Sequence, residues 1–261
     1  MYVLGIDSTV PSSVLESIGA GAASRGSVAV VNRADARQEQ TDWTYHGTVG
    51  PDAGWELASN SESLEDVLDI LAPRCEYVLL EGVESDRFPS ITWADGRCTG
   101  ELLSEPISPD DDGVEHILDR LENREPWITL ETLVEQTKAA NEAEQSGAIA
   151  TFTGRVRAKE TSDDTPTEYL EFERYGDIAD QRMAKIRAEL CERDGVFDVR
   201  MHHRTGVIPA GVDIVFVVVL AGHREEAFTT VEDGINRLKA EVPIFKKEVT
   251  VDEEFWVHTR P

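Results

Sequence analysis

Lysine is scarce in this chain. Six of its 25 basic residues are lysine, and residues 1–125 contain none. Against these bases stand 51 acidic residues, which give a formal net charge of -26. So acidic a surface repels nucleic acid and anionic membranes unless a local patch overrides it, which argues against non-specific DNA binding. Abundant carboxylates with little lysine also indicate adaptation to high salt, a halophilic habitat in which counterions screen self-repulsion.

Cysteine and long apolar runs are scarce too. The three cysteines, Cys75, Cys98 and Cys191, lack Cys-x-x-Cys spacing and are odd in number, which argues against a disulfide framework or a zinc knuckle. No stretch approaches the roughly 18 uninterrupted apolar residues of a membrane span. The start, MYVLGID, has no basic region ahead of an apolar stretch, so no signal peptide is indicated. We therefore expect a cytoplasmic protein.

The chain is long enough for two domains, which we expect at 1–125 and 126–261. The first alternates short apolar runs with helix-compatible segments, which predicts a small parallel α/β domain. The acidic, proline-containing stretch 105–113 is typical of a solvated loop. The expected strands are 2–6, 27–32 and 76–81, and the expected helices are 13–23 and 63–71.

The second domain mixes helix and strand patterns without regular alternation, which indicates an α+β fold. A helix over 129–144 is expected to open it, and the expected strands are 147–152, 169–174 and 212–221. Two further helices, 177–193 and 225–241, carry apolar residues at three- and four-residue steps. These core-facing residues are Ile178, Met183, Ile186 and Leu190 in the first helix, and Phe228, Val231, Ile235 and Leu238 in the second.

The segment LKAEVPIFKKE is the sharpest local anomaly, because it holds Lys239, Lys246 and Lys247 in a chain that otherwise avoids lysine. An ordinary alternative is a solvated charged face where a helix ends. The apolar residues beside the lysines instead favour a position at the rim of a pocket. A lysine held near other cations and partly desolvated can lose its proton near neutral pH and act as acid, base or nucleophile.

Two further segments supply cations. In FTGRVR, a glycine after an apolar strand lets the backbone turn while Arg155 and Arg157 point to one side. Guanidinium groups suit phosphate, although pairing with the many carboxylates is an equal alternative. In AGHR, His223 and Arg224 follow the most apolar strand and precede a helix, a junction that commonly faces a ligand.

Several other sites are disfavoured. His202 and His203 are adjacent, so on a strand they point to opposite faces, and no ligand-type residue stands at metal-site spacing near them or His223. No Gly-x-Ser-x-Gly elbow is present. The N-terminal segment GIDSTVPS has Val10 and Pro11 where a phosphate loop needs glycine and then lysine, so tight nucleotide binding is not expected.

In unbroken order, the segments GAIATFTGRVR, HHRTGVIPAG, VVLAGHREEAF, LKAEVPIFKKE and WVHTR resemble the catalytic (large) subunit of molybdopterin synthase, the MoaE family, over residues 146–260. The resemblance implies an α/β hammerhead fold and a sulfurtransferase that converts cyclic pyranopterin monophosphate to molybdopterin in molybdenum cofactor biosynthesis. It implies two sulfurs, each delivered by the C-terminal Gly-Gly thiocarboxylate of a ubiquitin-like small subunit. It further implies a homodimer core within a heterotetramer, with no cofactor and no metal.

Carried over by position, the resemblance implies that Lys239 and Lys246 are catalytic. Lys239 is expected to transfer protons or neutralise oxyanion charge, and Lys246 to hold the carrier's tail. Arg157, His223 and Arg224 are expected to position the phosphate. The full implied substrate-binding set is Arg155, Val156, Arg157, His223, Arg224, Lys239, Lys246, Lys247, Glu248 and Arg260.

Residues 1–125 resemble the small GTP-binding adaptor protein of molybdopterin-guanine dinucleotide biosynthesis, MobB, through the strand-turn start and the segment YVLLEGVES. Because Val10 and Pro11 depart from that pattern, we expect a degenerate P-loop-like domain used for contacts or cofactor handover. Two other functions stay open: a non-catalytic module that binds a ubiquitin-like tail, and a nucleotide-dependent switch. The retained lysines and His-Arg pair argue against the first, and the missing loop lysine argues against the second.

Overall fold

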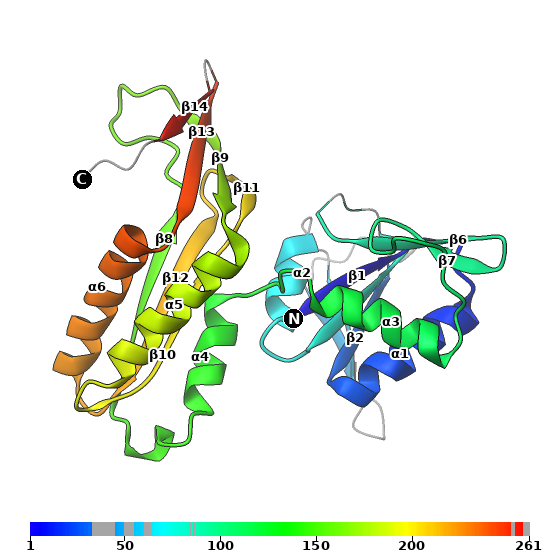
Figure 1. The fold of residues 1–261 in the computed structure, drawn as a ribbon, viewed down its shortest axis with the longest axis horizontal. Coiled ribbons are helices and arrows are strands. Elements are labelled where there is room, and N and C mark those ends of the chain that lie inside the picture. Colours follow the sequence, from blue (N-terminus) through cyan, green and yellow to red (C-terminus); the bar gives the residue numbers. More distant parts are fainter. Residues whose placement is uncertain are drawn as a thin grey trace. The chain divides into compact units, whose positions relative to one another are not determined.

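The structure is a computed structural model that describes residues 1–32, 45–49, 55–59, 64–83, 85, 87–251 and 254–257 (Figure 1). The chain divides into two compact units, Met1–Thr129 and Leu130–Pro261. None of the helices in the described part of the chain is long and apolar enough to cross a membrane.

The division falls after Thr129, a few residues later than the expected 125/126. Trp127 explains the difference, because its indole nitrogen donates to Asp69 at 2.8 Å and its ring meets Phe88 edge-on at 5.8 Å between centroids. The carbonyl of Trp127 also accepts a hydrogen bond from the amino group of Met1 at 3.2 Å. These contacts attach the linker to the first unit.

The first unit is built on a five-stranded sheet in the order β2-β5-β1-β6-β7. The β2-β5, β5-β1 and β1-β6 pairs are parallel, and the short β7 pairs antiparallel with β6. All three predicted strands and the parallel α/β class are confirmed. The strands are β1 (Tyr2–Ile6), β2 (Val28–Asn32), β5 (Tyr77–Glu81), β6 (Ser90–Ala94) and β7 (Arg97–Thr99), with a separate antiparallel pair, β3 (Tyr45–Val49) and β4 (Trp55–Ser59).

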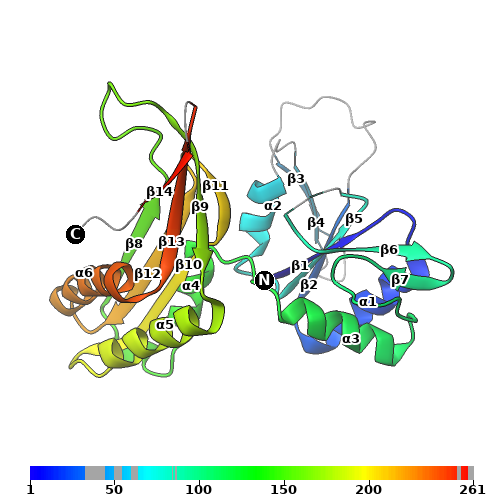
Figure 2. The same cartoon turned by 45° about the horizontal axis from the view of Figure 1, so that its top comes forward.

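Helices cover both faces of this sheet, as Figure 2 shows. Helices α1 (Ser12–Arg25) and α3 (Asp111–Glu122) share one apolar cluster with Leu4, Ile6 and Leu79, whereas α2 (Leu64–Leu71) belongs to a second cluster with Val3, Val78 and Leu80. Alternate residues of a strand point to opposite faces, so both sets must be apolar. This is why β1 and β5 appear in the sequence as continuous apolar runs.

Helix α3 corrects one expectation, because it begins at Asp111, inside the stretch 105–113 that was predicted to be loop. The side chain of Asp110 accepts a hydrogen bond from the Gly113 amide at 2.9 Å and so caps the helix. Carboxylates in a first helical turn also interact favourably with the helix dipole. The acidic run is therefore a helix start.

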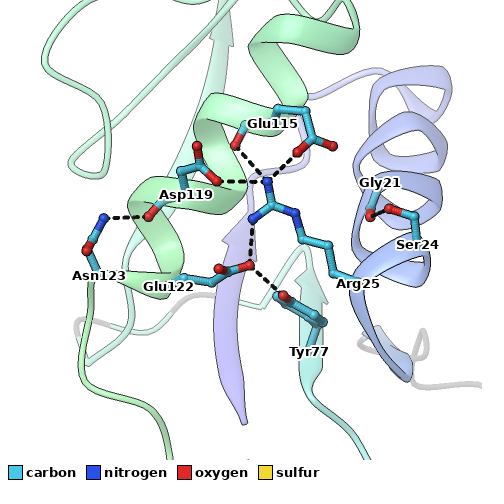
Figure 3. Close-up of polar contacts among 8 residues, drawn as sticks. All are labelled: Gly21, Ser24, Arg25, Tyr77, Glu115, Asp119, Glu122 and Asn123. Carbon is cyan, nitrogen blue, oxygen red and sulfur yellow. Dashed lines mark hydrogen bonds and ion pairs between the residues drawn. The ribbon is translucent and has the colours of Figure 1, made fainter.

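Arg25 joins α1 to α3 (Figure 3). Its guanidinium donates to Glu115, to Asp119 at 2.8 Å and to Glu122 at 2.6 Å. The hydroxyl of Tyr77 donates to the same oxygen of Glu122 at 2.6 Å, and this bond, together with Arg25, lowers the pKa of Glu122. In this lysine-free unit, one arginine thus neutralises part of a cluster of carboxylates.

We expect Arg25→Ala to lower the free energy of unfolding by about 1–2 kcal/mol, because it leaves three carboxylates without their shared cation. Because the folded-state pKa of Glu122 is lowered, its contribution is present above the ordinary carboxyl pKa and is lost as pH falls through the lowered value. Urea denaturation at several pH values should therefore show a shallower acid loss in the variant. Arg120→Ala, which removes an arginine that donates to Ser104 at 3.3 Å, is the matched control. An equal loss in both variants would contradict the assignment.

The second unit contains an antiparallel three-stranded sheet in the order β10-β12-β8. Helices α5 (Gly176–Cys191) and α6 (Arg224–Glu241) share the apolar cluster on one face with Val215, Val217 and Val219. Helix α4 (Leu130–Lys138) packs against β10 and β12 (Figure 1). The strands are β8 (Ala148–Arg155), β10 (Val196–His203) and β12 (Asp213–Ala221).

Helix α4 is shorter than the expected 129–144. Its end tightens, because the amide of Ala140 bonds to the Thr137 carbonyl three residues back. A short 3-10 helix, η1 (Ala143–Gln145), follows after a break. The other two predicted helices of the unit are confirmed with ends shifted by up to two residues.

A second antiparallel sheet has the order β11-β9-β13-β14. Leu170 and Phe172 of β9 are buried with Val156 and Ile208, and Ile244 of β13 packs against them. Together with the helices, these sheets confirm the predicted α+β class. The strands are β9 (Thr167–Arg174), β11 (Gly206–Pro209), β13 (Ile244–Thr250) and β14 (Glu254–Val257).

Two apolar residues expected in the core of the second unit lie at its surface. Ile178 is 61% exposed and Phe228 is 64% exposed. The buried face of α5 begins instead at Ala179, and that of α6 at Ala227. The apolar spacing therefore predicted the buried face of each helix slightly rotated about the helix axis from its position in the structure. Ile178 and Phe228 are large apolar side chains that do not pack in the core.

Candidate functional site

The three-stranded sheet supplies the floor of the candidate site. The strand register places His203, Val215 and Gly154 in one row across β10, β12 and β8, and Phe152 in the next row. Directly paired residues share a face, and Val215 and Phe152 belong to the cluster under α5 and α6. His203 and Gly154 therefore face the same helices.

Gly154 corrects the expectation of a turn, because it lies inside β8 and pairs with Val215. A Cβ atom at this position would lie 2.5 Å from Cγ1 of Val215. The glycine is thus required by close packing, and it leaves the β8 end of the row, beyond Val215, without a side chain.

Lys239 lies above this floor, in the last turn of α6. Its neighbour Leu238 is buried, and the Lys239 ammonium stands 5.9 Å from the centre of the Phe152 ring. That distance is within the range of a cation–π contact. The Lys239 side chain is nevertheless exposed, so the expected position at the rim of a pocket stays a prediction.

His203 lies near Lys239, and the sequence analysis considered it only as a metal ligand. Its side chain is 6% exposed, and its ring meets Phe172 edge-on at 4.8 Å between centroids. The pKa of His203 is lowered to about 4, by burial first and by the charges of Arg174 and Lys239, against an opposing hydrogen bond to the Arg204 carbonyl. The alternation of β10, which puts His203 on the same face as Met201, was the available signal.

Lys246 reaches the same region from β13. It pairs directly with Phe172 of β9, whose ring contacts His203, and opposed residues in such a ladder have Cα atoms about 5 Å apart. Lys239 and Lys246 thus approach the Phe172–His203 pair from a helix and from the second sheet. We define these four residues as the lysine site.

The two residues that follow Lys246 have side chains on opposite faces of β13. Lys247 points to the opposite face of β13, where it pairs with Glu254 at 2.8 Å. Glu248 lies on the same face as Lys246 and accepts a hydrogen bond from Thr167 at 2.5 Å. By the alternation of a strand, Glu248 belongs to the side of the lysine site and Lys247 does not.

The segment Arg155–Val156–Arg157 lies at the end of β8. Val156 is buried with Phe172 and anchors the segment to the second sheet. Arg155 pairs with Asp213 at 3.0 Å and Arg157 with Glu160 at 3.3 Å, so both arginines have the carboxylate partners of the ordinary alternative. Both side chains are nevertheless exposed, and exposed pairs of this kind exchange easily for another anion.

His223 and Arg224 lie apart from the lysines of the same chain. His223 is the N-cap residue of α6, Arg224 is its first residue, and Lys239 is in its last turn. At the rise of an α-helix, these ends are about 23 Å apart. Arg260, the last residue of the expected set, lies outside the described residues.

Residues 127–241 match the family described as MoaE protein. A Haloferax volcanii protein described as probable molybdopterin synthase is 46% identical over 262 residues, a match that covers 100% of both chains. The chain belongs to the molybdopterin synthase family. The full-length match shows that this relative carries the N-terminal unit as well.

Other members of the molybdopterin synthase family match about half of the chain. A molybdopterin synthase catalytic subunit of Pyrococcus abyssi is 34% identical over 124 residues, which is 48% of this chain and 82% of that protein. A solved structure of molybdopterin synthase from Staphylococcus aureus is 33% identical with a TM-score of 0.45, and it covers 52% of this chain and 93% of that one. The predicted function is confirmed: the chain is a sulfur-transferring enzyme of molybdenum cofactor biosynthesis.

The N-terminal unit has a cavity of about 250 Å³ at the carboxyl ends of β1 and β5. Such ends are the usual ligand position in parallel sheets. Asp7 is the charged residue among the described residues that line it, and no lysine or arginine joins them. A cavity of this charge repels a phosphate group.

Pro11 is the N-cap residue of α1. Because the side chains of Val10 and Pro11 carry no charge, neither residue supplies the cation of a phosphate loop. Among the described residues, no group of three histidine, cysteine, aspartate or glutamate side chains is arranged to hold a metal ion. In the second unit, the described side chains of the lysine site bring two cations near the Phe172–His203 pair.

Proposed function

We propose that this enzyme is the catalytic subunit that converts cyclic pyranopterin monophosphate to molybdopterin, with two sulfurs taken from the C-terminal Gly-Gly thiocarboxylate of a ubiquitin-like carrier. The observation that carries the proposal is the meeting of Lys239 and Lys246 at the Phe172–His203 pair. In a chain of net charge -26, such a pair of cations attracts and holds anionic reactants. Its expected fold class is the α/β hammerhead.

Lys239 is the proposed acid–base group and Lys246 the residue that holds the carrier's tail. The Lys239 ammonium lies 5.9 Å from the centre of the Phe152 ring, and a fixed positive charge stabilises negative charge that develops beside it in the reaction. Arg155 and Arg157, which lie at and just after the end of β8, exchange their exposed carboxylate partners for the substrate phosphate. Lys247, paired on the opposite face of β13, contributes to the local positive potential only.

We propose a homodimer in which His223 and Arg224 of each chain complete the site of the other. The support is geometric, because about 23 Å of rigid helix separates this pair from Lys239 in one chain. Phe228 lies one turn after Arg224 on the same side of α6 and is 64% exposed. An exposed aromatic side chain beside a cationic pair is typical of the anchor residues of protein interfaces.

A second apolar surface suits the carrier, which would complete a heterotetramer. Tyr175 and Phe245 meet edge-on at 5.6 Å, and both are exposed, as is Ile178 at the start of α5. Phe245 directly precedes Lys246, so a protein bound on this surface can extend its C-terminal tail toward the lysine site. The surface and the pocket together provide a docking face and a place for the thiocarboxylate.

For the N-terminal unit we propose a degenerate domain of the GTP-binding adaptor type that serves contacts or cofactor handover. The parallel sheet fits that fold type. The cavity lined by Asp7, without a described cation, fits the loss of nucleotide binding. Equilibrium binding of labelled GTP at micromolar affinity would overturn this part.

We also propose that the protein works in a salt-rich cytoplasm. Its three cysteines are free thiols, which fits a reducing compartment. The excess of carboxylates fits high salt. Full activity and an unchanged melting temperature in dilute buffer would remove the support for the second statement.

The proposed reaction is tested by incubating the full chain with cyclic pyranopterin monophosphate and a thiocarboxylated carrier at high salt. We expect molybdopterin to form with two carrier thiocarboxylates consumed per pterin. Binding of the carrier without loss of its thiocarboxylate sulfur would instead identify a non-catalytic tail-binding module.

A further inference from the structure

We propose that His203 is a positioning residue for Lys239, which presents Nε2 of a fixed imidazole tautomer as the hydrogen-bond acceptor for the lysine ammonium. The inference deepens the proposed function, since it rests on Lys239 acting at that site. It adds a residue from β10 that supports the chemistry through Lys239.

The tautomer follows from one contact. Nδ1 of His203 lies 2.7 Å from the carbonyl oxygen of Arg204. A carbonyl oxygen only accepts, so Nδ1 carries the proton and donates it. The lone pair of the neutral ring therefore resides on Nε2. The edge contact with Phe172 and the near-complete burial hold the ring in this orientation.

The surroundings of His203 keep it neutral. Burial is the largest effect on its pKa, which lies at about 4, and the charges that act on it are those of Arg174 on β9 and Lys239 on α6. Its neighbour His202, with a pKa of about 3, is neutral at the same pH. Because the folded-state pKa is far below 6.5, His203 remains an acceptor throughout the physiological range. A neutral acceptor among cations is the group that an ammonium can approach without repulsion.

The geometry of the site allows Nε2 of His203 to accept a hydrogen bond from Lys239. Lys239 lies in the last turn of α6, and its ammonium is 5.9 Å from the centre of the Phe152 ring. Gly154 lies beside Val215 in the row of His203, so no side chain rises from that end of the row. An acceptor on the floor of the site reduces the freedom of the ammonium and holds it for reaction, which is where positioning contributes to rate.

The test compares His203→Phe, which keeps an aromatic ring, with His203→Gln, which keeps a polar group near the position of Nε2. We expect the phenylalanine variant to lower kcat about 10–100-fold at little change in KM. The glutamine variant should recover most of that loss. His116→Phe, on the exposed side of α3, is the control and should leave kcat unchanged. Melting curves confirm that each variant is folded.

Two measurements separate positioning from mere packing. If His203 acts through Lys239, His203→Phe should cause no further loss in a Lys239→Ala background. The kcat–pH profile of the wild-type enzyme should show no change in slope near pH 6.5 that disappears in His203→Gln. A change of that kind would mean that His203 itself carries the proton. Additive losses, or such a change in slope, would overturn the proposal.

A measurement that needs no activity keeps this inference distinct from the proposed function. Nitrogen-15 NMR of the histidine side chains in the wild-type chain at neutral pH should show His203 with its proton on Nδ1 and no titration near 6.5. A proton on Nε2, or a charged ring, would overturn the positioning role even if molybdopterin forms. The expected tautomer with no molybdopterin formed would count against the reaction and leave the described acceptor in place.

Discussion

Lys239→Ala is expected to lower kcat for molybdopterin formation about a thousand-fold, because it removes both a proton-transfer group and a positive charge from the site. Lys239 is the residue whose ammonium lies over the Phe152 ring and acts on His203. The assay should use saturating thiocarboxylated carrier, so that the loss is read in kcat and not in carrier binding.

Two variants control for this result. Lys138→Ala removes a lysine of α4 that pairs at the surface with Glu135 at 2.8 Å, and it should leave kcat unchanged. Lys239→Arg keeps the positive charge but exchanges the proton far less readily, so its activity separates charge from proton transfer. Normal dithiolene formation by Lys239→Ala would exclude the proposed role of this lysine.

Composition and periodicity predicted the elements of both units well. The strands β1 and β5 are buried on both faces, and a strand of that kind must be apolar throughout, so its run of residues is visible in the sequence. The cluster of lysines was equally visible, because Lys239 and Lys246 lie close together in a chain with few lysines. Local signals of this kind do not depend on which segments later meet in space.

The partners of the site were beyond local signals. His203 joins Lys239 because β10 pairs with β12 and lies under α6, and it joins Phe172 because the second sheet packs alongside. Such contacts depend on the register in which distant strands pair, and the register cannot be predicted from a single stretch of sequence. The misplacement of Ile178 and Phe228 has a related cause, because a helix with apolar residues on more than one side does not reveal which side the core will take.

The His-Arg pair shows the limit most clearly. The sequence predicted His223 and Arg224 at the start of a helix, and the structure does place them at the start of α6. The same expected helix, 225–241, carries Lys239 near its other end, but a helix range does not say which molecule supplies the groups that meet at one site. A straight α-helix cannot bring its ends together, so residues that act at one site from both ends must come from two molecules.

Mixing two inactive variants should therefore restore activity. In a dimer of one Lys239→Ala chain and one Arg224→Ala chain, one site holds both substitutions and the other holds neither. Random exchange of equal amounts makes half of the dimers mixed, so we expect about a quarter of wild-type activity, from a background near zero. Molybdopterin formation is measured after the variants have been exchanged under conditions that dissociate and reassociate the dimer.

The matched control mixes Lys239→Ala with Lys246→Ala. These two lysines approach the same Phe172–His203 pair within one chain, so every site in their mixed dimer lacks one of them and no activity should return. Recovery in this control, or no recovery in the Arg224→Ala mixture, would show that the His-Arg pair does not act across the dimer. The difference between the two mixtures measures the contribution of the second chain, because each variant alone carries a single substitution in an otherwise identical protein.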